Sequence, residues 1–192
     1  MPATSVRTVS LFCLGLFVAS GVVLADNAQA ARPERIELVL NGEGIRNFLF
    51  LDIYQVALFL PQKLTDPQAV LNRDLPRRVR ITLLREVSAE RDLEFLLGGL
   101  EDNNSAEEMA LIQAPLDQFM HLIRELGTVA KGSIVQLDYA PGIGTRVWLN
   151  QRLLGAVPGV AFNRSLLKIW LGERPIQKSL KRALLGEIKE AI

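Results

Sequence analysis

The chain has 192 residues, 49% of them hydrophobic, and its 22 basic and 21 acidic side chains leave a net charge of +1. No basic stripe with interleaved aromatic residues runs along it, which argues against a nucleic acid as its partner. The length is sufficient for one domain with a substantial buried core.

The first thirty residues have the pattern of a secretory signal peptide. Arg7 supplies a basic n-region, residues 11–24 are almost entirely apolar, and Ala28-Gln29-Ala30 matches an A-x-A cleavage site, with Val23-Leu24-Ala25 as a weaker alternative. The apolar run is about fourteen residues long, short of the roughly twenty needed to cross a bilayer. We therefore expect cleavage after Ala30, no membrane span in the mature chain, and a periplasmic or secreted protein.

The mature chain, residues 31–192, is predicted to be a single domain, because no repeat, low-complexity tract or linker interrupts it. The only cysteine, Cys13, lies in the predicted signal peptide, so we expect neither disulfides nor thiolate chemistry in the mature chain. His121 is the only histidine, and no second ligand stands at metal-binding spacing. We therefore expect no metal site and no cofactor.

The first half of the mature chain alternates between predicted strands and turns. Strands are predicted over residues 36–40, 48–60 and 78–84. Gly42-x-Gly44 lacks the third glycine of a dinucleotide-binding loop and predicts a turn, while Asp66-Pro67 predicts a short helix. The third strand alternates strictly, and the cluster Arg77-Arg78-x-Arg80 at its start is interpreted as a solvated strand face.

The second half combines helices with a further set of strands. Ser88 is expected to cap a helix through Leu100, and Ser105-x-x-Glu108 is a capping box that opens a longer helix, which Pro115 is expected to kink or restart. Three strands are predicted next, over residues 134–139, over residues 145–149 and in the segment ending at Val157. Two helices follow, one before Gly172 and one after Pro175. The last helix carries Leu180, Leu184 and Ile188. The predicted fold class is α+β, an antiparallel β-sheet layered with helices on one face.

The apolar segment after the glycine pair carries the candidate binding residues. Arg46 precedes a long apolar run whose one polar aromatic residue is Tyr54. Because a guanidinium stays protonated, Arg46 needs an anionic or carbonyl partner, which indicates an apolar pocket with a polar anchor. Alternatively, Arg46 pairs with Glu43 or Asp52, and Tyr54 is a core aromatic residue whose hydroxyl bonds to the backbone.

Several motifs occur in order over roughly residues 35–186. They include Asn41-Gly42-x-Gly44-x-Arg46, Tyr54-x-x-Ala57-Leu58-Phe59-Leu60, Asp138-Tyr139-x-Pro141-Gly142-x-Gly144-Thr145 and Phe162-Asn163-Arg164-x-Leu166-Leu167-x-Ile169-Trp170-Leu171-Gly172. In this set the chain resembles the chalcone isomerase-like superfamily, most closely its exported bacterial branch. The resemblance implies a cleft between sheet and helices. In the plant enzymes this cleft cyclises a chalcone, and in fatty-acid-binding relatives it holds an acyl chain.

The resemblance carries over unevenly to single residues. It places Arg46 at the arginine of both groups and Tyr54 at the tyrosine with which fatty-acid binders grip the carboxylate. The further polar groups of the enzymes fall at Asp92, Gly99 and Ile169. The resemblance therefore implies no catalytic residues and an exported, non-catalytic binder of a small amphipathic or fatty-acid-like ligand. The alternatives are an isomerase of chalcone isomerase type, which is an intramolecular lyase, and a structural or partner-binding periplasmic domain.

Overall fold

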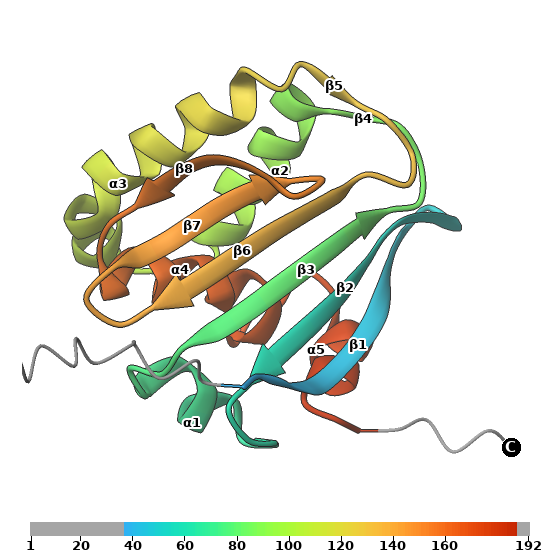
Figure 1. Cartoon of the computed structure of the whole chain (residues 1–192). Helices are drawn as coiled ribbons and strands as arrows, with labels where there is room; N and C mark the ends of the chain where they lie inside the picture. Colours follow the sequence, from blue (N-terminus) through green and yellow to red (C-terminus); the bar gives the residue numbers. More distant parts are fainter. Residues whose placement is uncertain (1–36, 188–192) are drawn as a thin grey trace, which may run out of the picture. The chain divides into compact units, whose positions relative to one another are not determined.

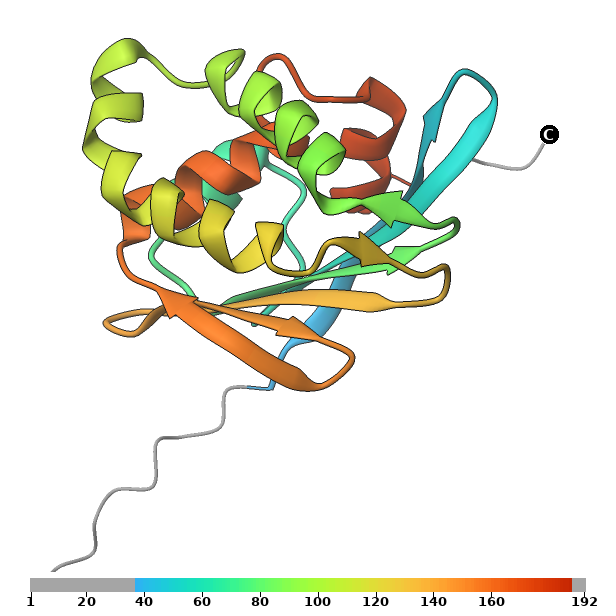
Figure 2. The same cartoon turned by 90° about the horizontal axis from the view of Figure 1, so that it is seen from above.

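The computed structural model describes residues 37–187, which form one antiparallel sheet with helices packed on one of its faces (Figure 1; Figure 2). The sheet order is β1-β2-β3-β6-β7-β8, and these strands are Val39–Phe48, Leu51–Leu60, Arg77–Leu83, Ile134–Ala140, Gly144–Leu149 and Arg152–Val157. Two short strands, β4 (Val87–Ser88) and β5 (Thr128–Val129), pair with each other. The helices are α1 (Pro67–Asn72), α2 (Ala89–Glu101), α3 (Ala106–Arg124), α4 (Val160–Leu171) and α5 (Lys178–Leu184). The predicted fold class is confirmed, whereas the predicted signal peptide and Ile188 lie outside the described residues.

The first hairpin differs from the prediction in the position of its turn. Gly42 and Gly44 lie inside β1, and the turn is made by Leu49 and Phe50, within the segment predicted as one strand over residues 48–60. Both turn residues have positive φ, 46° and 67°. The prediction was wrong because glycine pairs usually mark turns, whereas leucine and phenylalanine carry no turn signal.

The start of β1 is shaped by the close approach of α5. A Cβ atom on Gly42 would overlap the backbone carbonyl of Ala183, so only glycine fits there. Asn41 beside it is buried. Its amide donates to the carbonyl oxygens of Leu184 at 2.7 Å and Leu64 at 2.9 Å, and it accepts from the Leu64 backbone N–H at 2.7 Å. These contacts hold β1 against the C-terminal helix.

Strand β3 alternates as predicted, with Val79 buried and Arg80 exposed. Arg77 contradicts the predicted solvated face, since it shares the buried side with Val79 and is only 2% exposed. Its guanidinium lies over the ring of Tyr139, 4.9 Å from the centroid, and donates to the carbonyl oxygen of Val70 at 2.6 Å. The physical reason is the period of two along a strand, which turns residue 77 to the same side as residue 79.

The two longer helices on the sheet begin where the sequence predicts. Ser88 occupies the N-cap position of α2 without a side-chain capping bond, while Ser105 and Glu108 form the predicted capping box of α3. Pro115 lies inside α3, and the helix continues past it to Arg124 without the restart considered in the sequence analysis.

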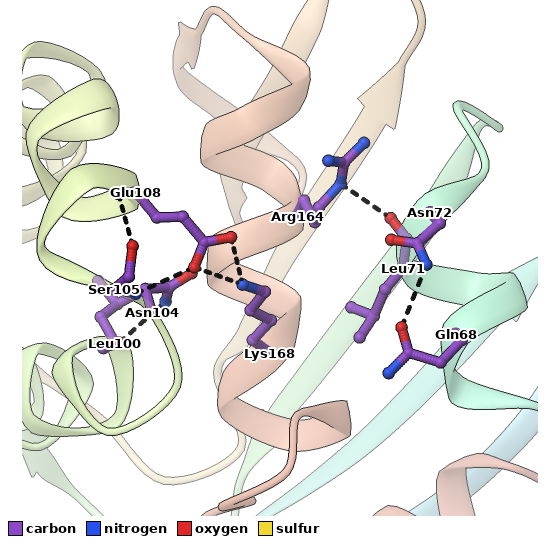
Figure 3. A network of polar contacts seen from close by, with 9 residues as sticks. All are labelled: Gln68, Leu71, Asn72, Leu100, Asn104, Ser105, Glu108, Arg164 and Lys168. Atoms are coloured by element: carbon purple, nitrogen blue, oxygen red, sulfur yellow. Dashed lines mark hydrogen bonds and ion pairs between the residues drawn. The ribbon is translucent and has the colours of Figure 1, made fainter.

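Polar contacts from α3 and α1 fix helix α4 (Figure 3). The Nζ atom of Lys168 donates to both carboxylate oxygens of Glu108, at 2.7 and 2.8 Å, and Arg164 Nε donates to the carbonyl oxygen of Leu71 at 3.1 Å. The Lys168 bond also holds the pKa of the Glu108 carboxyl below its ordinary value. The other faces of α4 are buried. Their side chains that lie in the core include Phe162, Leu166, Ile169 and Trp170.

Candidate functional site

A cavity of about 520 Å³ lies between the sheet and the helices. Its walls come from β1, β2, β3 and β6 on the sheet side and from α2, α3 and α4 on the helix side. Most of the lining side chains are apolar, among them Ile53, Ile81, Leu93, Leu96, Ile123 and Leu166. A cavity of this size and character is typical of sites for small amphipathic molecules.

Arg46 and Tyr54 meet at this cavity. They are direct cross-strand partners in the β1–β2 pair, so their side chains leave the same face of the sheet, and both line the cavity. Arg46 Nη1 donates to Gln177 Oε1 at 3.3 Å and to the carbonyl oxygen of Asn47. The guanidinium also lies 5.9 Å from the ring centroid of Phe48. The structure thus brings together the two residues that the sequence singled out.

The alternative pairing of Arg46 with an acidic neighbour is not found. Among residues 37–187, no carboxylate lies within ion-pair distance of Arg46. Glu43 accepts a hydrogen bond from Gln55 instead, and Asp52 accepts one from Asn47. The guanidinium therefore faces an apolar cavity without an anionic partner from the described part of the chain.

Tyr54 is held by an indole that the sequence analysis did not connect with it. Trp170 Nε1 on α4 donates to the Tyr54 hydroxyl at 3.1 Å, in place of the backbone bond that the alternative interpretation expected. Within the described residues that hydroxyl donates to no protein acceptor, so its proton is available to a cavity ligand. Burial raises the pKa of Tyr54, and the side chain remains a neutral donor at physiological pH.

Asp92 adds a carboxyl group to the lining of the same cavity. It lies on α2, lines the cavity and is partly buried. Burial raises the pKa of Asp92 from 3.8 to about 6. The charge of Asp92 raises the pKa of Tyr54, and the charge of Arg46 lowers it, so the three groups share one electrostatic environment. Sequence reasoning placed Asp92 only as a replacement residue and gave no sign of this raised pKa.

The other candidate residue types lie elsewhere. His121 is exposed on α3, with Nε2 3.3 Å from Glu125 Oε1. Over residues 37–187, no three His, Cys, Asp or Glu side chains come together as metal ligands. In the same range, no helix has both the length and the hydropathy to span a membrane.

Comparison with known proteins assigns the fold and the family. The family model described as chalcone isomerase-like matches residues 18–186. The chain belongs to the chalcone isomerase-like family. Among solved structures, the chain is similar to a fatty-acid binding protein of Arabidopsis thaliana, with a TM-score of 0.62 and 16% sequence identity. The match covers 77% of this chain and 86% of that chain. That likeness shows a shared fold. No curated protein sequence matches the chain.

Two positions where the resemblance expects polar groups of the family's enzymes are apolar here. Ile169 of α4 is buried and lines the cavity. Gly99 of α2 packs directly against it, since a Cβ atom on Gly99 would lie 3.2 Å from Ile169 Cγ2. These two residues close the helix–helix contact and offer no side-chain donor or acceptor.

Proposed function

We propose that this chalcone isomerase-like protein is a non-catalytic binder of a fatty-acid-like ligand. The apolar chain of the ligand would occupy the cavity, and its carboxylate would lie at Arg46 and Tyr54. The observation that carries this proposal is the convergence of Arg46 and Tyr54 on one apolar cavity, with donor groups left over after their protein contacts. The structural likeness to a plant fatty-acid binding protein supports the ligand class.

The chemistry of the site suits one carboxylate. A guanidinium offers a planar fork of N–H donors, and charge-assisted bonds to it are stronger than neutral ones. The Tyr54 hydroxyl, turned by its bond from Trp170, adds a neutral donor. Asp92 also lines the cavity, and its ionised form opposes negative charge there, so a ligand with one anionic group placed at Arg46 and a long apolar remainder suits the site best.

The same residues argue against chalcone cyclisation. That reaction needs a phenolate held near an enone and electrostatic stabilisation of the developing enolate. Arg46 supplies charge, but Gly99 and Ile169 supply no orienting group. We expect no chalcone turnover in a spectrophotometric assay, and a rate on the order of 1–1000 per second would contradict the proposal.

We also propose that the ligand is bound outside the cytoplasm. The support is the sequence pattern of residues 1–30, with its A-x-A site at Ala30. N-terminal sequencing of the protein from its producing cells should give Ala31 as the first residue. Recovery of intact Met1 in the membrane fraction would refute export by cleavage.

Two measurements test the ligand directly. Lipid extraction and mass spectrometry of the purified protein should release an acyl carboxylate. Palmitate titration of a Trp148→Phe variant should then change the emission of Trp170, which is the one tryptophan left and lines the cavity beside Tyr54. A saturable change supports the proposal. The absence of both an extracted acyl ligand and a saturable change would overturn it.

A further inference from the structure

Two hairpins of the sheet close on turns of the same backbone form but opposite chemistry. The β1–β2 turn has Leu49 and Phe50 at φ 46° and 67°, and the β7–β8 turn has Asn150 and Gln151 at φ 47° and 70°. Paired positive φ values are typical of type I′ turns, which favour Asn and Gly. Asn150 fits this preference, and its side chain accepts a bond from the Ile134 N–H at 2.8 Å.

The backbone conformation of such a turn does not favour leucine or phenylalanine. A side chain with a Cβ is disfavoured at positive φ, and neither residue can form the local hydrogen bonds by which Asn tolerates it. Phe50 is nevertheless fully exposed, and Leu49 is 73% exposed. Phe48 and Leu51 on either side are also exposed, so four consecutive apolar residues form the tip. A contiguous apolar surface of this kind marks an interaction site.

The tip, residues 48–51, borders the cavity. Phe48, Leu49 and Leu51 line it together with the exposed Phe95 of α2, whose ring centroid lies 5.9 Å from that of Phe48. In Figure 2 the β1–β2 hairpin rises from the edge of the sheet toward the helix side and ends in a projecting loop. The apolar surface of the tip is thus continuous with the apolar wall of the cavity.

Charged residues share the cavity lining with residues of the apolar tip. Arg46, Arg85 and Arg91 line the cavity, where the acidic lining residues are Glu86 and Asp92. This balance leaves a small positive excess beside an apolar apex. Apolar side chains followed by arginines are typical of segments that enter the headgroup region of a bilayer.

We propose that the tip, residues 48–51, inserts into the surface of a lipid bilayer and places the cavity beside the acyl region of the membrane. A projecting apex of four apolar residues is far smaller than the roughly 20–30 residues a side of a stable protein interface, whereas a bilayer accepts such an apex at a depth of about 5–10 Å. The proposal goes beyond ligand binding and does not depend on it. Together the two would allow an acyl ligand to pass between membrane and cavity.

The test compares the two hairpins in vesicle binding. A chain beginning at Ala31 contains every described residue and omits the apolar leader segment. It should co-sediment with vesicles of equal parts phosphatidylcholine and phosphatidylglycerol. The double variant Leu49→Asn, Phe50→Gly places a preferred type I′ pair in the turn, so it should fold and yet lose about ten-fold or more of its vesicle partitioning. The control Gln151→Gly places glycine at the matching second position of the polar turn, and it should leave partitioning unchanged.

A second readout locates the contact. The chain from Ala31 has no cysteine, so Phe50→Cys or Gln151→Cys introduces a single site for an environment-sensitive fluorophore. Vesicles should shift the emission of the label to the blue at position 50 and leave it unchanged at position 151.

Several outcomes would overturn the proposal. These are a parent chain that does not bind vesicles, equal binding by the Leu49→Asn, Phe50→Gly variant with an unchanged circular dichroism spectrum, or a shifted emission at both labels. A dimer that depends on the tip, seen by size-exclusion chromatography without vesicle binding, would assign the surface to a second copy of the chain. Palmitate titration without vesicles is a separate measurement, so failure here leaves the ligand proposal standing.

Discussion

Asn41 and Arg46 lie near opposite ends of the same strand, and their polar groups are satisfied in different ways. Asn41 is buried, and both its amide nitrogen and its amide oxygen bond to the protein backbone. Arg46 faces an apolar cavity and, within the described residues, has no anionic partner. A saturated buried group stabilises the fold, whereas a cation with spare donors on an apolar cavity is available to a ligand. Strand β1 therefore combines a structural anchor with a candidate ligand anchor.

The largest expected effect is at the structural end of β1. Gly42→Ala adds a Cβ that overlaps the Ala183 carbonyl, so α5 must move away from the strand. We expect the free energy of unfolding to fall by about 3 kcal/mol, measured by urea denaturation, with the palmitate affinity of the folded protein unchanged.

Gly98→Ala is the matched control for that change. Gly98 lies in α2, where an added Cβ meets no atom within 4 Å. Alanine is the better helix former, so this variant should gain about 0.5–1 kcal/mol in the free energy of unfolding. Equal behaviour of the two variants would mean that α5 does not pack on β1.

A pH-dependent effect is expected at the cavity end. The pKa of Asp92 is raised from 3.8 to about 6, so the folded protein holds a proton that the unfolded chain releases between these values. Ionised Asp92 therefore destabilises the folded state increasingly as the pH rises through this window. Asp92→Asn should raise the free energy of unfolding by about 1–2 kcal/mol above this window, because solvent partly screens this half-buried carboxyl group, and it should have little effect below the window. A stability difference that did not vary with pH would contradict this assignment.

A smaller effect is expected from Tyr54→Phe. The substitution removes one neutral donor from the cavity and the acceptor of Trp170 Nε1. We expect the palmitate Kd to rise two- to ten-fold, since a neutral hydrogen bond contributes about 0.5–1.5 kcal/mol. Tyr139→Phe is the control, because the Tyr139 hydroxyl donates to Asp74 at 2.5 Å and does not line the cavity. It should lower stability without changing the Kd, and a ligand effect of equal size in both variants would argue against a role for Tyr54.

Much of the fold could be predicted from the sequence because its hydrophobic periods are regular. The alternation in β3 and the helical spacing in α3 and α4 gave the correct element types and the correct sheet class. The turn of the first hairpin could not be predicted, since Leu49 and Phe50 contradict ordinary turn chemistry. Gly42 is required by its contact with a helix about 140 residues further along the chain, and not by a turn. Local patterns do not contain such long-range contacts.

The candidate site was predictable in part. The position of Arg46 in an apolar segment and the family resemblance both pointed to Arg46 and Tyr54, and the strand register brings the two together. The bond from Trp170 and the raised pKa of Asp92 arise from the packing of α4 and α2 over β2, and no spacing in the sequence marks them. The buried position of Arg77 was missed because the chemistry of its side chain was weighed above the strand period.

The central claim is that Arg46 receives the carboxylate of an acyl ligand. It is tested most directly by comparing palmitate with hexadecanol, which has the same chain length and no charge, in the parent and in Arg46→Ala. The parent should bind palmitate more tightly than hexadecanol. Arg46→Ala should weaken palmitate binding about ten- to a hundred-fold, remove most of that preference and leave the urea midpoint nearly unchanged, because a charge-assisted bond contributes about 1.5–3 kcal/mol. A parent without the preference, or an Arg46→Ala variant that keeps it in full, would contradict the account.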